Sequence, residues 1–302
     1  MFAAPPSVEA EVFAVIPDEF RRGDAPSDWA KVQLHGAASP VFLEGPAFDR
    51  DGNLWVTDIP WGRLFKVTPA GEVTIGLEYD GQPNGMKFMT DGTALIADHR
   101  RGLIRFDPTS GDVTPWFDRY RLEPFKGCND LTIAKNGDVW FTDQGQSSLA
   151  DPTGRLYRVR SADGELELML DGLPGVNGLV FTANEGALLL AMTRANAIWK
   201  LMLHDGGQPG KLGTWIQMQG GTGPDGLAID EEDNVVACHV GLGSVWAFSK
   251  LGEPLLRIRS PQGLYTTNCA YGGPDNKTLF ITESASGTIL KAQLPVAGRT
   301  LI

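Results

Sequence analysis

Residues 44–67 read EGPAFDRDGNLWVTDIPWGRLFKV, and this stretch decides the fold because its pattern returns five more times along the chain. An acidic residue opens it and a short apolar segment follows. After a turn rich in Asp, Asn and Gly come a second apolar segment, a Gly-bearing loop and a third strand-like segment. Such turns are typical of hairpins, because these residues tolerate positive φ. A further turn after most units implies a fourth strand.

The opening position recurs every 40–48 residues, a spacing typical of stacked β units such as propeller blades. It always holds an acid or an amide: Glu44, Asn84, Asn129, Asn177, Asp225 and Asn268. Six such units predict an all-β fold, a six-bladed β-propeller of four-stranded antiparallel blades. We expect residues 1–302 to form this single domain, with repeats over about 42–295.

Two segments lie outside the repeats. The strand-like residues 11–17 precede them, and the last unit ends after its third strand. We therefore expect this N-terminal strand to close the last blade and remove an open edge. The sequence DAPSDWA at residues 24–30 is expected to open a short helix.

Composition limits the partners. The formal net charge is −11, which disfavours nucleic acid or an anionic membrane and suits a cation or a neutral small molecule. No signal peptide or membrane-spanning stretch is predicted. The three cysteines, Cys128, Cys238 and Cys269, lack metal-type spacing and are expected to be buried free thiols in a reducing compartment. We expect a cytoplasmic protein, and the oligomeric state stays open.

Antiparallel pairing predicts which face carries the site. If the first strand of a blade starts on one face of the ring, the second strand ends on that same face. The opening residues should therefore share one mouth with the second-strand ends, namely Asp58, Asp98, Asp143, Met192, His239 and Glu283. The opposite face is expected to hold only the hairpin turns rich in Asp, Asn and Gly.

The chemistry of the openings indicates a hard cation. Carboxylates and carboxamides suit calcium better than they suit a structural zinc, and Glu44 with Asp225 would balance a dication. At any single position, capping of a turn explains an Asn or Asp equally well. Its recurrence at all six positions favours a shared site.

Several motifs resemble one known family: LEGPAF at 43–48, CNDLTI at 128–133, VNGLVF at 176–181, PDGLAID at 224–230 and NCAYGGPDNKTLFITES at 268–284. Over roughly residues 40–295 the chain resembles the SMP-30/gluconolactonase/LRE-like (regucalcin-like) family of six-bladed propellers. The resemblance implies one divalent cation, most commonly Ca²⁺ with Zn²⁺, Mn²⁺ or Mg²⁺ as alternatives. It implies the ligands Glu44, Asn129, Asn177 and Asp225.

The resemblance also implies a substrate class. Characterised members are mostly sugar-lactone hydrolases, and structurally similar relatives hydrolyse organophosphates. The expected function is therefore metal-dependent opening of a small sugar or sugar-acid lactone. A phosphotriester or fluorophosphate hydrolase and a non-enzymatic calcium-binding regulatory protein are the alternatives.

Further residues are candidates because the pairing argument places them at the mouth. Asp225, His99 and His239 are candidate proton carriers or catalytic groups, although a carboxylate bound to a dication is a poor base. Arg100 could hold a substrate carboxylate, because guanidinium groups suit bidentate contacts. The complete expected substrate-binding set is Asn84, His99, Arg100, Asp143, Trp61 and Asn268.

Overall fold

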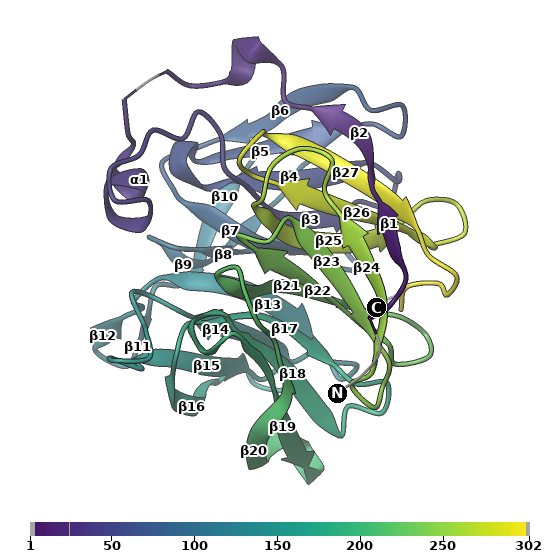
Figure 1. The fold of residues 1–302 in the computed structure, drawn as a ribbon. Helices are drawn as coiled ribbons and strands as arrows, with labels where there is room; N and C mark the ends of the chain where they lie inside the picture. The colour runs from purple at the N-terminus through teal and green to yellow at the C-terminus, as the bar shows by residue number, and fades with distance from the viewer. Residues whose placement is uncertain (1–3, 24, 300–302) are drawn as a thin grey trace.

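The computed structural model describes residues 4–23 and 25–299 and confirms the six-bladed propeller. Six antiparallel four-stranded sheets surround one axis (Figure 1), and the first repeat strand of each blade is innermost. Blade 1 contains β3 (Leu43–Phe48), β4 (Leu54–Asp58), β5 (Arg63–Val67) and β6 (Val73–Glu78). Blade 2 contains β7 (Pro83–Phe88), β8 (Ala94–Asp98), β9 (Gly102–Phe106) and β10 (Val113–Phe117). Blade 3 contains β13 (Cys128–Ile133), β14 (Val139–Asp143), β15 (Gly154–Val159) and β16 (Leu166–Leu173).

The second half of the ring repeats this arrangement. Blade 4 contains β17 (Val176–Phe181), β18 (Ala187–Met192), β19 (Ala197–His204) and β20 (Gln208–Gln217). Blade 5 contains β21 (Gly223–Ile229), β22 (Val235–Val240), β23 (Ser244–Phe248) and β24 (Pro254–Arg259). Blade 6 contains β25 (Thr266–Gly272), β26 (Thr278–Glu283) and β27 (Thr288–Gln293), with a fourth strand from the N-terminus.

The N-terminal segment joins two blades. β2 (Glu11–Val15) pairs antiparallel with β27 and is the outer strand of blade 6. β1 (Ser7–Glu9) pairs in parallel with β24 and adds a fifth strand to blade 5. Figure 1 shows the purple N-terminal strands beside these late strands. The start and the end of the chain thus stabilise one another, because each covers a strand edge of the other.

Short elements complete the chain. The helix expected after residue 24 is α1 (Asp28–Gln33), which begins where the Ser27 hydroxyl accepts the Ala30 amide at 3.1 Å. A two-stranded hairpin and four 3₁₀ turns lie in the loops: β11 (Arg119–Tyr120), β12 (Glu123–Pro124), η1 (Asp18–Phe20), η2 (Ile59–Trp61), η3 (Thr193–Ala195) and η4 (Asp205–Gly207). None of the helices in the described part of the chain has the length and apolar character needed to cross a membrane.

A β-bulge marks the opening position of every inner strand. In β3, Glu44 pairs with Thr57 but Ala47 pairs with Trp55, so one extra residue lies in the inner strand. The same register shift occurs in β7, β13, β17, β21 and β25. Because bulges re-aim side chains, this device turns the opening residues toward the axis.

Glycine follows most opening residues because the inner strands approach one another closely at the axis. At Gly45, whose φ is +48°, a Cβ atom would lie 2.1 Å from the carbonyl oxygen of Asn84. At Gly178, a Cβ atom would lie 2.4 Å from the carbonyl oxygen of Asp225. A larger residue would therefore push the blades apart and widen the site.

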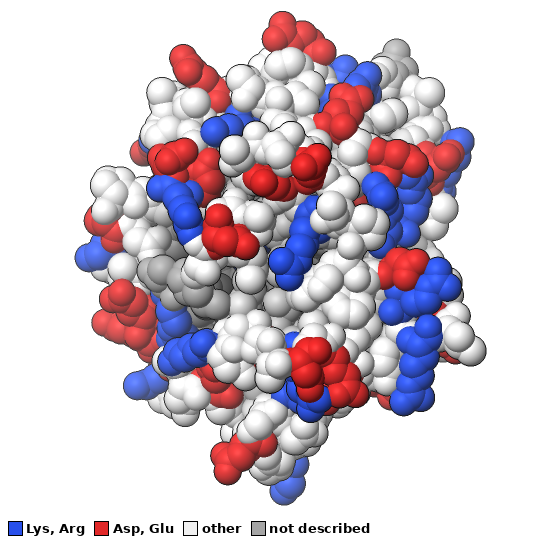
Figure 2. Space-filling model, turned by 180° about the vertical axis from the view of Figure 1, so that it is seen from behind, with Lys and Arg blue, Asp and Glu red and all other residues white. Residues whose placement is uncertain are grey.

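The core lies between the blades, and charge lies on the surface. Trp55 of blade 1 is buried against Met86 and Phe106 of blade 2, and Trp140 of blade 3 is buried beside Phe181 of blade 4. On the face in Figure 2, acidic and basic side chains of the described residues are interspersed. All three cysteines are buried free thiols, as expected.

Candidate metal centre and substrate cavity

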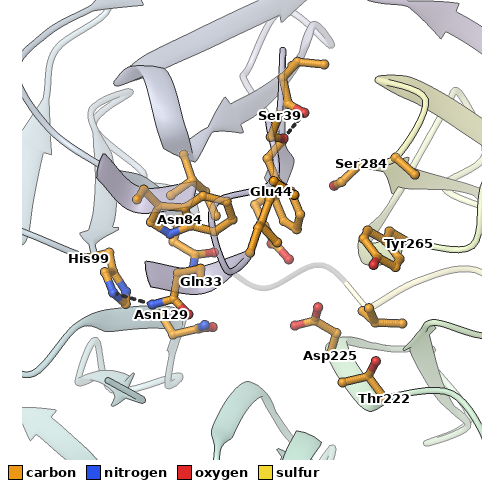
Figure 3. Close-up of a pocket in the computed structure, with 18 of the residues that line it drawn as sticks. Gln33, Ser39, Glu44, Asn84, His99, Asn129, Thr222, Asp225, Tyr265 and Ser284 are labelled. Atoms are coloured by element: carbon orange, nitrogen blue, oxygen red, sulfur yellow. Dashed lines mark hydrogen bonds between the residues drawn. The ribbon is translucent and has the colours of Figure 1, made fainter. Parts of the chain in front are cut away.

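A cavity of about 620 Å³ opens at the mouth where the inner strands begin. Five of the six opening residues line it, from five different blades: Glu44, Asn84, Asn129, Asn177 and Asp225. Figure 3 shows Glu44, Asn84 and Asn129 along one part of the wall and Asp225 across the open space from Asn129. The structure therefore brings the four expected metal ligands, Glu44, Asn129, Asn177 and Asp225, to one cavity.

Hydrogen bonds orient the side chains that the cavity exposes. The Asn129 amide nitrogen donates to Gln144 Oε1 at 3.2 Å, which leaves Asn129 Oδ1 available. Glu44 Oε2 accepts the Gly45 amide and the Asn268 amide nitrogen, both at 2.8 Å, which leaves Glu44 Oε1 available. Asn84 Oδ1 is buried without any hydrogen-bond partner among the described residues.

Negative charge is concentrated at the centre. Burial raises the pKa of Glu44 to about 7, and the nearby Asp130 carboxylate adds to this rise. Burial, followed by the charges of Glu44 and Asp130, raises the pKa of Asp225 well above its usual range. Burial also raises the pKa of Asp130. The folded chain thus holds acidic groups whose ionised forms need a compensating positive charge.

These donors fit a hard divalent cation. The available oxygens of Glu44 and Asn129, with the Asn177 carboxamide and the Asp225 carboxylate, are the ligand types that calcium takes. Among the described residues, no group of three or more His, Cys, Asp or Glu side chains is placed to hold a metal. A cation would therefore have to use the mixed carboxylate and carboxamide set.

The sequence model described as the SMP-30/Gluconolactonase/LRE-like region matches residues 42–285. The chain belongs to this family. The resemblance read from the motifs is confirmed.

Two curated relatives of this SMP-30/gluconolactonase-like protein are named as lactonases. The gluconolactonase of Zymomonas mobilis is 31% identical over 294 residues, which cover 87% of this chain and 81% of that protein. Lactonase drp35 of Staphylococcus aureus is 27% identical, covering 77% and 73% of the two chains.

Solved structures share the fold. A calcium-binding regucalcin from Agrobacterium tumefaciens has a TM-score of 0.79 at 22% identity, covering 99% of this chain and 98% of that one. A gluconolactonase from Xanthomonas campestris has a TM-score of 0.75 at 22% identity, covering 97% of each chain.

In this family member, none of the six second-strand ends lines the cavity, and five of them bond backbone groups of loops: Asp58, Asp98, Asp143, His239 and Glu283. In blades 1 to 5 each of them pairs with the residue directly before the opening residue, and in blade 6 Glu283 pairs with Thr266, two residues before Asn268. Asp143 was expected to bind substrate, but it is fully buried and accepts the amides of Lys126 at 3.0 Å and Gly127 at 2.7 Å. Asp98 accepts the amide of Gln82 in the same way. These carboxylates fix the entry loops, because unpaired buried amides would be costly.

His239 plays the same bracing part in blade 5, which corrects its expected catalytic role. Its side chain is buried, and Nε2 contacts the Gly220 carbonyl oxygen at 2.8 Å. Burial lowers its pKa, so the ring is neutral at pH 7 and donates through Nε2. His239 does not line the cavity.

Three more expected substrate contacts lie outside the cavity wall. Arg100 is exposed and pairs with Asp80. The Trp61 indole donates to the Ser39 carbonyl oxygen at 3.0 Å and so anchors the segment at 33–42, much of which lines the cavity. Asn268 is 3% exposed and bonds Glu44, so it orients a candidate ligand without facing the substrate space.

His99 does line the cavity, as expected. Its Nε2 atom contacts the Gln33 amide nitrogen at 3.1 Å, shown by the dashed line in Figure 3. The ring fills the space above Gly127, where a Cβ atom would lie 2.4 Å from the ring. Burial lowers the pKa of His99, so the ring is neutral near pH 7 and its Nε2 accepts the bond from Gln33.

The sequence reasoning missed two groups of residues. Asp130 occupies the position where four other blades have glycine, and that departure was a visible signal. The others lie in α1 or in the loops around the mouth, where the repeat gives no guide to side-chain direction. These are Arg21, Gln33, His35, Gln144, Arg194, Thr222 and Tyr265.

Proposed function

We propose that this chain is a divalent-cation-dependent lactonase that opens a small sugar or sugar-acid lactone. One observation carries the proposal: opening residues of five blades line a single cavity, each re-aimed by a β-bulge. Relatives named gluconolactonase and lactonase support the reaction class. Fold alone would not, since propellers host many functions.

The cation would be held by Glu44, Asn129, Asn177 and Asp225, and calcium suits this donor set best. The calcium-binding regucalcin with the same fold supports that choice. The chemistry such a cation supplies is Lewis-acid polarisation of an ester carbonyl.

The chain's own residues have separate tasks in this proposal. Asn84 lines the cavity and orients a substrate hydroxyl, for which its buried Oδ1, without a partner among the described residues, is the acceptor. His99, one of two described histidines that line the cavity, carries a proton between the attacking water and the solvent after its Nε2 leaves Gln33. Gln33 holds the ring through Nε2, and the segment at 33–42 restricts access of water.

The test is an ester-hydrolysis assay on purified protein, before and after exhaustive chelation and after return of Ca²⁺, Zn²⁺, Mn²⁺ or Mg²⁺. We expect hydrolysis of D-glucono-1,5-lactone that chelation abolishes and one ion restores. Asn129→Ala and Asp225→Ala should abolish it with the ring still folded by circular dichroism. Asn184→Ala, in a turn on the opposite face, is the control. Full activity after chelation, or in either site variant, contradicts the proposal.

Two alternatives give different outcomes in the same assay. Faster turnover of a phosphotriester such as paraoxon than of any lactone would indicate the phosphotriesterase. Tight calcium binding without hydrolysis of any lactone or phosphotriester would indicate a calcium-binding protein, which the regucalcin fold also fits.

A further inference from the structure

Arg194 is an exposed cation on the wall of the cavity, at the start of blade 4's mouth loop. Only two arginines of the described residues line this cavity, Arg21 and Arg194. Arg21 is engaged, because it donates to the carbonyl oxygens of Ile16 at 3.2 Å and Ser286 at 2.6 Å. Arg194 forms neither an ion pair within 4 Å nor a hydrogen bond with any described residue.

Other mouth arginines show what a paired arginine looks like here. Arg63 donates twice to Asp58, and Arg155 pairs with Glu123 at 3.1 Å. Arg194 differs from them because it lines the cavity with no side-chain partner among the described residues, which leaves all of its donors available to a ligand.

The position of Arg194 is fixed by the neighbouring blade. The Thr193 hydroxyl donates to the Pro224 carbonyl oxygen at 2.7 Å, and the Asn196 amide donates to the Gly220 carbonyl oxygen at 2.8 Å. Both bonds tie η3 to the loop that delivers Thr222 and Asp225. The turn therefore holds Arg194 at a constant place relative to Asp225.

The stem of Arg194 lies over Gly175. A Cβ atom on Gly175 would lie 2.5 Å from Arg194 Cγ, and the φ of Gly175 is +66°. The glycine thus leaves space that the arginine stem fills. Packing on the backbone limits the rotamers of the stem of this cavity-lining residue.

Neutralising Asp225 does not account for Arg194. Its charge does act on Asp225, but less strongly than burial and the charges of Glu44 and Asp130, and no hydrogen bond joins the two side chains. A guanidinium meant as a partner for a buried carboxylate would bond it directly, as Arg63 bonds Asp58 at 2.6 Å.

We infer that Arg194, with the exposed hydroxyl of Thr222, binds a carboxylate on the substrate, so that the substrate is the lactone of a sugar diacid. This rests on the proposed function, because the reacting ester is placed at the acid and amide centre. Because the ester occupies that centre, the carboxylate lies elsewhere along the wall, where Arg194 is the available cation among the described residues. A single guanidinium matches the single charge of a carboxylate.

The experiment compares kcat/KM for D-glucaro-1,4-lactone, which carries a carboxylate, with that for neutral D-glucono-1,5-lactone. Arg194→Gln should lower kcat/KM for the carboxylate lactone by on the order of 10- to 100-fold more than for the neutral one, mostly through KM. Arg119→Gln, which removes an exposed arginine that pairs with Asp118 and does not line the cavity, is the matched control and should change neither.

Equal losses of kcat/KM on both lactones would overturn the inference, because Arg194 would then affect the acid and amide centre and not a substrate carboxylate. No loss on either would also overturn it. A phosphorylated sugar lactone hydrolysed faster than the carboxylate lactone, with the same dependence on Arg194, would replace the diacid by a phosphate substrate.

A binding measurement separates this inference from the proposed function. Calorimetric titration with glucarate and gluconate needs no turnover. Glucarate should bind the wild type at least about 10-fold more tightly than Arg194→Gln, and gluconate should show a smaller difference. Arg194-dependent glucarate binding without any lactone hydrolysis refutes only the lactonase. Hydrolysis without that dependence refutes only the diacid subsite.

Discussion

The Asn268 amide nitrogen donates to Glu44 Oε2 at 2.8 Å, across the seam where the last blade meets the first. The same amide nitrogen lies 3.5 Å from Asp130 Oδ2, and Asn268 Oδ1 accepts the Cys269 amide. One side chain from blade 6 therefore holds carboxylates from blades 1 and 3. Closure of the ring and orientation of a candidate cation ligand depend on the same residue.

Replacing Asn268 should weaken cation binding without unfolding the ring. In Asn268→Ala, Glu44 loses its amide donor and Glu44 and Asp130 are left less well compensated. Loss of a partner that orients a ligand typically costs about 10- to 100-fold in metal affinity. Calcium titration calorimetry of the variant and of Asn184→Ala measures the change. An affinity equal to that of the control would show that Glu44 is held without Asn268.

Replacing Asp225 should stabilise the cation-free protein while removing activity. The folded-state pKa of Asp225 is raised, so in chelator the stability of the wild type falls as pH rises through that pKa. Asp225→Asn has no carboxyl group at this position, so its stability does not fall with pH in this way. With chelator its melting temperature should exceed that of the wild type at pH 8, by about 2–4 °C per kcal/mol, and the difference should shrink at pH 5. A variant less stable than the wild type at pH 8 would contradict the repulsion.

Asp143 should matter for stability and not for substrate contact. Asp143→Ala leaves the Lys126 and Gly127 amides without their acceptor, which should cost roughly 2–4 kcal/mol of unfolding free energy. Urea denaturation measures this, with Asp275→Ala in an exposed turn as the control that loses less. Unchanged stability together with a large rise in KM would restore Asp143 as a substrate residue.

His239 should make stability depend on pH near 6. Its folded-state pKa is lowered by burial, so the unfolded chain binds the proton more readily below the unfolded value of about 6.5. Its stabilising contribution is present above that pH and is lost as pH falls. His239→Gln keeps a donor for the Gly220 carbonyl oxygen but does not titrate. Its unfolding free energy should fall less than that of the wild type between pH 8 and pH 5. Parallel curves would show that the histidine does not titrate on unfolding.

The pairing argument located the second-strand ends but not their contacts. Asp143 pairs with Cys128, directly before the opening residue Asn129, as the sequence predicts. Its carboxylate nevertheless turns to the amides of the entry loop, because two buried N–H groups there need an acceptor. Strand pairing gives the face on which a residue lies. It does not give the direction of the side chain.

The repeat pattern did not predict which loop residues would meet the cavity. Arg100 and Arg194 both follow a second strand, and only Arg100 was expected to meet the substrate. The structure pairs Arg100 with Asp80 and leaves Arg194 over Gly175 at the cavity. Nothing local distinguishes the two, because the outcome depends on which neighbours the adjacent blade supplies.

By itself, the sequence determined the number of blades, the mouth that holds the site, and the acids and amides at the strand openings, because repeat spacing and hairpin turns are local properties. Only the tertiary structure decided which of those groups share one cavity and which brace loops. That decision depends on bulges, buried hydrogen bonds and contacts between blades far apart in the chain, such as the bond from Asn268 to Glu44.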